Sequence, residues 1–104
     1  MIGIDLVSIV EFQRQLDLGG ESFLRKAFTD SELENRQVSH VAGLWAAKEA
    51  VVKAAGIPAA KLTDVVVSYD ASGRPHGTLD THHFELSISH HGDYAVAVAL
   101  MVTT

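Results

Sequence analysis

Residues 41–55 read VAGLWAAKEAVVKAA, a stretch whose many alanines favour an α-helix. Its bulky apolar side chains cluster at Leu44, Trp45, Val51 and Val52. Gly56, with Pro58 just beyond it, is a typical C-terminal stop for such a helix. The pattern therefore predicts a helix over residues 41–55, and the remaining elements are assigned around it.

The first residues of the chain alternate in a way that predicts a β-strand over residues 1–7. One face would carry Ile2, Ile4 and Leu6, and the other Gly3, Asp5 and Val7. A carboxylate opposite the apolar face needs a specific partner. One ordinary possibility is that Asp5 is satisfied by a nearby helix N-terminus.

Two capping-box patterns predict helices between this strand and residue 41. Ser8 with Glu11 indicates a helix that ends at Gly19 and Gly20, and residues 21–27 fit a further short helix. Thr29 with Glu32 repeats the pattern and predicts another helix near Asp30.

Beyond Leu62 the apolar period changes to two, which predicts antiparallel strands over residues 64–69, 74–79, 84–89 and 94–102. The last of these is apolar on both faces, so we expect it to be buried on both sides, under helices or against another subunit. A helical half followed by a β-rich half gives an α+β fold, an antiparallel sheet packed with helices. The length of 104 residues predicts a single domain over residues 1–104.

Composition excludes several classes of protein. The chain has no cysteine, which removes disulfide frameworks and thiolate zinc sites, and its net charge of −5 with scattered Lys and Arg argues against nucleic-acid binding. No apolar run approaches the ~20 residues needed to cross a bilayer, and no signal-peptide pattern is present. We therefore expect a cytoplasmic protein without a membrane span.

Charged residues on the alanine-rich helix suggest phosphate chemistry. Glu49 and Lys53 lie four residues apart and project from one face, with Lys48 on its flank. A surface ion pair between Glu49 and Lys53 is the ordinary interpretation. Alternatively, Asp5 and Glu49 could hold a magnesium ion whose other ligands come from water and substrate phosphates, with Lys48 and Lys53 on the phosphate oxygens.

The segment 86–94, LSISHHGDY, ends a strand with Ser89, His90 and a glycine turn, all of which can contact phosphate. An ordinary polar hairpin is the alternative. The pairs His82–His83 and His90–His91 are poor chelators, because adjacent strand residues point to opposite faces. His40 and His76 are expected in solvent-facing loops.

Three segments in order, GIDLV at residues 3–7, WAAKEAVVKA at 45–54 and LSISH at 86–90, resemble the signatures of holo-acyl-carrier-protein synthases in the 4′-phosphopantetheinyl transferase superfamily. The segments FTDSE at 28–32 and DASGRP at 70–75 resemble further features of that family. The resemblance therefore runs along nearly the whole chain.

The resemblance implies an enzyme of fatty acid biosynthesis that moves 4′-phosphopantetheine from coenzyme A to a serine of an apo acyl carrier protein, releasing adenosine 3′,5′-bisphosphate. It implies a homotrimer with active sites between subunits. Asp5 and Glu49 would be magnesium ligands, Lys53 would contact the coenzyme A pyrophosphate, and Ser89 and His90 would lie at the nucleotide phosphates. Glu49 and Lys53 would be the catalytic residues.

Three positions depart from the family pattern. Leu44 stands where the family usually has an arginine that contacts coenzyme A, and Glu11 stands where many members have an arginine that docks the carrier. Arg14 lies nearby in the sequence. With this difference at residue 11, the carrier could be recognised in another way and could be a domain built into a large fatty acid synthase. The chain also lacks the length for a helix before Phe84. A non-catalytic coenzyme-A-binding trimer and a metal-dependent nucleotide hydrolase are the alternative functions.

Overall fold

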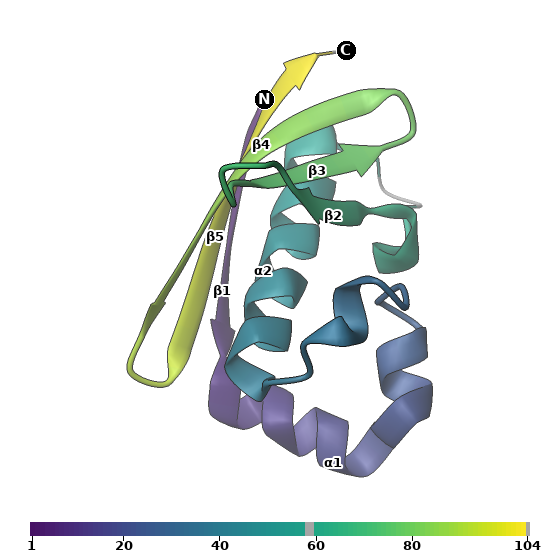
Figure 1. The fold of residues 1–104 in the computed structure, drawn as a ribbon, viewed down its shortest axis with the longest axis vertical. Coiled ribbons are helices and arrows are strands. Elements are labelled where there is room, and N and C mark those ends of the chain that lie inside the picture. Colours follow the sequence, from purple (N-terminus) through teal and green to yellow (C-terminus); the bar gives the residue numbers. More distant parts are fainter. Residues whose placement is uncertain (58–59, 104) are drawn as a thin grey trace.

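Two helices and five antiparallel strands build the computed structural model, which describes residues 1–57 and 60–103 (Figure 1). The strands are β1 (Ile2–Ser8), β2 (Val66–Tyr69), β3 (Pro75–Leu79), β4 (His82–His91) and β5 (Tyr94–Thr103). The helices are α1 (Ile9–Arg25) and α2 (Val38–Ala55), with short 3-10 turns η1 (Glu32–Glu34) and η2 (Leu62–Asp64). The predicted α+β class is confirmed.

The sheet has the strand order β1-β5-β4-β3-β2, so the first strand of the chain pairs with the last. Asp5 lies opposite Ala97 in this pairing. Strands β3 and β4 are joined directly through Asp80 and Thr81, as expected for a chain that has no helix before Phe84. Helix α2 lies along one face of the sheet, and α1 crosses near one end of α2 (Figure 1).

Helix α2 matches the prediction and begins three residues earlier, at Val38. It ends at Gly56 in the left-handed conformation (φ 67°), where the amide donates to Val52 O. Pro58, the second half of the predicted stop, lies outside the described residues.

Small residues let α2 approach the sheet closely. Fully buried alanines lie on both sides of the contact, at Ala46, Ala47, Ala50, Ala54, Ala95, Ala97 and Ala99. Gly3 on β1 is the tightest point, because a Cβ there would lie 2.1 Å from Ala50 O. The backbone of β1 therefore rests directly on the backbone of α2.

The face of β1 that carries the larger apolar residues is not the face that turns toward α2. The face with Gly3, Asp5 and Val7 turns toward α2, and the opposite face leaves 69% of Ile2, 59% of Ile4 and 64% of Leu6 exposed.

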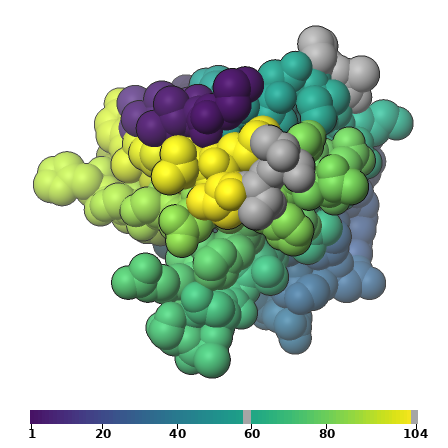
Figure 2. All heavy atoms as spheres, turned by 90° about the horizontal axis from the view of Figure 1, so that it is seen from above, coloured from purple at the N-terminus to yellow at the C-terminus, as the bar shows by residue number. Residues whose placement is uncertain are grey.

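Strand β5 has its alanine face under α2, as predicted, whereas Tyr94, Leu100 and Val102 are exposed on its other face. Figure 2 shows the start of β1 beside the end of β5 on the surface. We call this exposed apolar surface of β1 and β5 the outer face.

Helix α1 bends at Gly20, whose φ of 57° and ψ of −142° are not helical. The first half begins as predicted, because Ser8 caps it by accepting a hydrogen bond from Glu11 N at 3.2 Å. The predicted helix over residues 21–27 is the second half of α1, which ends at Arg25.

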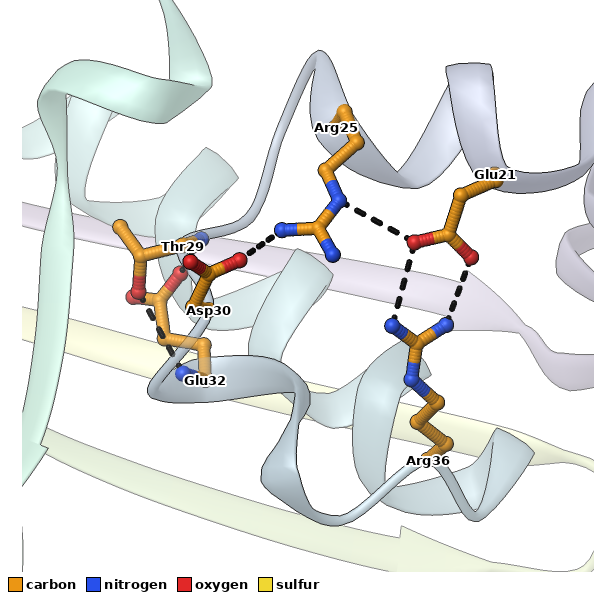
Figure 3. Close-up of polar contacts among 6 residues, drawn as sticks. All are labelled: Glu21, Arg25, Thr29, Asp30, Glu32 and Arg36. Atoms are coloured by element: carbon orange, nitrogen blue, oxygen red, sulfur yellow. Dashed lines mark hydrogen bonds and ion pairs between the residues drawn. The ribbon is translucent and has the colours of Figure 1, made fainter.

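The helix predicted near Asp30 is wrong, because the structure forms only the single turn η1 there. The capping box is present: Glu32 N is 3.3 Å from Thr29 Oγ1, and Thr29 N donates to Glu32 Oε1 at 2.9 Å (Figure 3). Asn35 is extended and caps Gln37 N, so the chain turns directly into α2. A capping box thus fixes a turn here without starting a long helix.

An ion-pair network beside this turn joins α1 to the segment before α2 (Figure 3). Arg36 binds Glu21 at 2.7 and 3.1 Å, and Glu21 also accepts from Arg25, whose guanidinium reaches Asp30. The hydrogen bond from Arg36 holds the pKa of Glu21 below its usual value. These side chains are exposed, so each pair contributes little stability.

Lys48 and Glu32 form a buried ion pair, with 0% and 2% of their side chains exposed. Lys48 Nζ lies 2.7 Å from Glu32 Oε1 and donates to Val65 O at 2.7 Å and Leu62 O at 3.2 Å. The second carboxylate oxygen of Glu32 accepts from Val67 N at 2.8 Å. The sequence prediction that Lys48 contacts substrate phosphates is therefore wrong, because its ammonium group is enclosed in the core.

None of the helices within residues 1–57 and 60–103 is long and apolar enough to cross a membrane.

The contact at Gly3 predicts an unequal response to the same substitution at two glycines. We expect Gly3→Ala to lower the free energy of unfolding by about 3 kcal/mol, because its new methyl meets a backbone carbonyl. Gly77→Ala is the matched control, since its Cβ would meet the Val51 side chain at 3.2 Å, which can move. Urea unfolding of both variants measures the difference. Equal losses would contradict the assigned contact.

The buried pair predicts a large cost for removing one partner. Lys48→Met should lower the free energy of unfolding by about 3–5 kcal/mol, because it leaves the Glu32 carboxylate buried without its cation. Adding Glu32→Gln to Lys48→Met should recover part of that loss, since the uncompensated charge is then gone. Thermal and urea unfolding of the single and double variants provide the test, and a single variant as stable as the parent would refute the pairing.

Candidate active site

The contact between β1 and α2 brings together Asp5, Glu49 and Lys53. Lys53 Nζ lies 3.0 Å from Asp5 Oδ1 and donates to Ile4 O at 3.0 Å. The interpretation of Glu49 and Lys53 as a surface pair is thus wrong, because the carboxylate that Lys53 binds is Asp5. The close approach at Gly3 explains why, since it places β1 within reach of this face of α2.

Glu49 is half-buried beside Asp5 without a salt bridge within the described part of the chain. Burial raises the pKa of Glu49, the negative charge of Asp5 raises it further, and the positive charge of Lys53 acts in the opposite direction. The two carboxylates therefore repel each other, and a cation between them would relieve that repulsion.

Both carboxylates line a hollow of about 280 Å³ between β1, α1 and α2. Its wall is formed by Asp5, Leu6, Val7, Ser8, Glu11, Phe12, Gln15, Trp45 and Glu49. Phe12 and Trp45 pack together with ring centroids 5.7 Å apart. The sequence pattern predicted no site role for Ser8, Gln15 or Trp45, and Glu11 was expected only at the carrier-docking position. The available signal for Ser8, Glu11 and Gln15 was their helical spacing, because the N-cap and residues 11, 12 and 15 lie on one side of α1.

The oxygen donors fit a magnesium ion that keeps most of its coordination for water and phosphate. Mg²⁺ in phosphoryl-transfer sites is typically held by one or two carboxylates plus substrate phosphates, and Asp5 with Glu49 supplies such a pair. Across residues 1–57 and 60–103, no group of three or more His, Cys, Asp or Glu side chains is placed to hold a metal by itself. A metal here would therefore depend on substrate oxygens.

Ser89 and His90 lie elsewhere, on β4, and do not line the hollow that holds Asp5 and Glu49. His90 Nε2 is 2.9 Å from Ser39 O at the start of α2, and the ring packs on Gly43. Ser89 is exposed and pairs with Val96 of β5. One copy of the chain therefore does not bring all the predicted phosphate-binding residues together.

A second hollow, of about 500 Å³, lies near this part of α2 and is lined by Ser31, Glu32, Glu34, Asn35, His40, Leu44, Ser68 and Tyr69. Leu44, which stands in place of the family arginine, is almost fully buried. His40 stacks on Tyr69 with centroids 6.5 Å apart. Burial lowers the pKa of His40, and the neighbouring His90 lowers it further.

The prediction of loop positions for His40 and His76 is wrong. His40 belongs to α2, which starts earlier than its alanine-rich segment indicated, and His76 belongs to β3. His76 Nε2 lies 2.8 Å from Asp70 Oδ2 across the β2–β3 turn. Glu11 and Arg14 on α1 form an exposed pair at 2.9 Å, so the charge of Glu11, which lines the hollow, is paired with that of Arg14.

The chain matches the family model of the 4′-phosphopantetheinyl transferase superfamily over residues 1–99. A holo-acyl-carrier-protein synthase of Nautilia profundicola is 36% identical over 98% of this chain and 99% of its own. One from Verminephrobacter eiseniae is 35% identical over 96% of this chain and 91% of its own.

A solved structure gives the same result. The holo-acyl-carrier-protein synthase of Helicobacter pylori in complex with coenzyme A superimposes with a TM-score of 0.89, at 30% identity, over 97% of this chain and 99% of that one. The fold and the sequence both match over nearly the whole length of the chain. The two comparisons therefore give the same family. The chain belongs to the 4′-phosphopantetheinyl transferase superfamily, in the family of the holo-acyl-carrier-protein synthases.

Proposed function

We propose that this chain, as one domain over residues 1–104, transfers 4′-phosphopantetheine from coenzyme A to a serine of an apo acyl carrier protein. The products are the holo carrier and adenosine 3′,5′-bisphosphate, as required for fatty acid biosynthesis. The observation that carries this proposal is the pair of carboxylates, Asp5 and Glu49, that line one hollow, with Lys53 bound to Asp5. The family membership and the coenzyme A complex of the Helicobacter pylori relative support it.

Asp5 and Glu49 would hold Mg²⁺, which when bound would offset the negative charge of the coenzyme A pyrophosphate. The protein supplies two oxygen donors from separate, rigid elements, β1 and α2. The backbone contact at Gly3 fixes the spacing of β1 and α2, from which the two carboxylates project.

The transfer itself forms a bond between the carrier serine oxygen and the β-phosphorus and breaks the bond from that phosphorus to the bisphosphate leaving group. Glu49 is the candidate base for the serine proton, directly or through water, and its raised pKa suits that role. Lys53 would stabilise the negative charge on the leaving phosphate. Most of the rate enhancement comes from positioning these groups.

The active enzyme would be a homotrimer with sites between subunits. The outer face is the argument from the structure, because an apolar surface with Ile2, Ile4 and Leu6 more than half exposed is costly in water. The separation of Ser89 and His90 from the carboxylates is the second argument, since a neighbouring copy could bring them to the nucleotide phosphates.

The carrier partner would be recognised differently from that of many family members. Glu11 replaces an arginine and binds Arg14, which leaves less positive charge on α1 for an acidic carrier. A carrier domain within a large synthase is the partner that we favour testing beside a free-standing carrier. The cytoplasm remains the predicted location.

A non-catalytic coenzyme-A-binding trimer is disfavoured by the same three residues. Two carboxylates held side by side cost stability through repulsion, and a scaffold gains nothing from them. The third alternative, a metal-dependent nucleotide hydrolase, would release phosphate without any carrier protein.

The proposal predicts carrier modification that requires both magnesium and the carboxylates. Apo carrier incubated with the protein, coenzyme A and Mg²⁺ should gain the mass of one phosphopantetheine, and a chelator should abolish the gain. Asp5→Asn and Glu49→Gln should each lower kcat/KM by at least about 100-fold. Asp17→Asn, an exposed position outside the hollow, is the control. Activity near that of the parent in either site variant would refute the residue assignment.

The trimer predicts that a charge on the outer face separates the subunits. Leu100→Asp should convert a trimer to monomers in sedimentation velocity and lower activity, because it places a carboxylate in the contact. Leu18→Asp, on the exposed side of α1, is the matched control and should stay trimeric. A monomeric parent protein, or a trimeric Leu100→Asp variant, would show that this surface is not the interface.

A further inference from the structure

Lys53 has two hydrogen-bond partners, and both are on β1. Its ammonium group donates to Ile4 O and binds Asp5 Oδ1, each at 3.0 Å. Lys53 is 54% exposed, whereas Asp5 is only 17% exposed. The lysine therefore covers a largely buried carboxylate from the solvent side and neutralises it.

This arrangement conflicts with a metal ion on Asp5. Mg²⁺ binds carboxylate oxygens at about 2.1 Å, and an ammonium group on the same carboxylate would repel it. The acidic hollow holds three carboxylates, from Asp5, Glu11 and Glu49. Arg14 pairs with Glu11, so Lys53 is the cation assigned to Asp5 among the described residues.

Lys53 can move away from Asp5 once another cation takes its place. Its side chain is long and more than half exposed, so the ammonium group can turn into solvent, whereas Asp5, 17% exposed, still needs a positive partner, which a bound metal would supply. Ile4 O lies on β1, an edge strand of the sheet. Water can therefore replace the lysine at this carbonyl.

We infer that Lys53 is a placeholder cation: it neutralises Asp5 while the metal is absent and moves to the coenzyme A pyrophosphate when metal and substrate bind. This inference rests on the proposed function. Metal alone must displace the ammonium group into water, whereas coenzyme A offers it a new anionic partner. Metal and coenzyme A then strengthen each other's binding, and Lys53 carries part of that coupling.

The first test measures metal affinity without coenzyme A, with Mn²⁺ as the probe and its free concentration read by electron paramagnetic resonance. Lys53→Met should bind Mn²⁺ about three- to tenfold more tightly than the parent, because the competing cation is gone. Lys53→Arg keeps the charge and should not gain affinity. Lys26→Met, on the exposed end of α1, removes the same charge far from Asp5 and controls for net charge. Unchanged or weaker Mn²⁺ binding by Lys53→Met would overturn the inference.

The second test measures coenzyme A affinity with and without Mn²⁺ by calorimetry. In the parent protein Mn²⁺ should tighten coenzyme A binding, and in Lys53→Met that enhancement should shrink. Tighter metal binding with unchanged coenzyme A binding would support the placeholder but refute the pyrophosphate contact of the proposed function. Unchanged metal binding with weaker coenzyme A binding would refute the placeholder role but support the pyrophosphate contact of the proposed function. Circular dichroism and the unfolding midpoint verify that each variant is folded.

Discussion

The site depends on one backbone contact, the approach of β1 to α2 at Gly3 and Ala50. There is no room for a side chain at residue 3, and the alanines of α2 and β5 keep the whole layer thin. This thinness puts Asp5 within hydrogen-bond distance of Lys53 and beside Glu49, although they are more than forty residues apart in sequence. If leucines held the helix about 10 Å from the sheet, the usual packing distance, Asp5 would not reach Lys53 or lie beside Glu49.

The rotation of α2 about its own axis is the second constraint on the site. Two adjacent residues of the helix, Lys48 and Glu49, show how it is rotated. Lys48 points into the core and binds Glu32 and two carbonyl oxygens, while Glu49 points to the hollow. The buried pair can be satisfied only in one rotation, because Lys48 must reach both η1 and the start of β2. Such a pair adds little net stability, but its loss is costly, so it favours one arrangement over nearby alternatives.

Local patterns in the sequence were enough to predict α2, the set of strands and the bend near Gly20. Alanine content, the repeat period of apolar residues and the presence of glycine each determine structure over only a few residues. They also selected Asp5, Glu49 and Lys53. The buried role of Lys48 and the single turn at Glu32 were missed, because both depend on a pairing between residues sixteen positions apart. The charge pattern of the helix gave Lys48 the wrong role, because neighbours in sequence point to different faces of a helix.

The orientation of β1 is the most informative feature that the alternating pattern left open. Alternation predicts which residues share a face but does not predict which face turns inward, and here the small residues are inside because α2 must lie close. The larger apolar residues are left on the outer face, beside those of β5. The same strand therefore presents its carboxylate to α2, and its apolar side chains form part of the exposed outer face. The closeness of β1 to α2 thus accounts both for the position of Asp5 and for the apolar surface that we propose as the subunit contact.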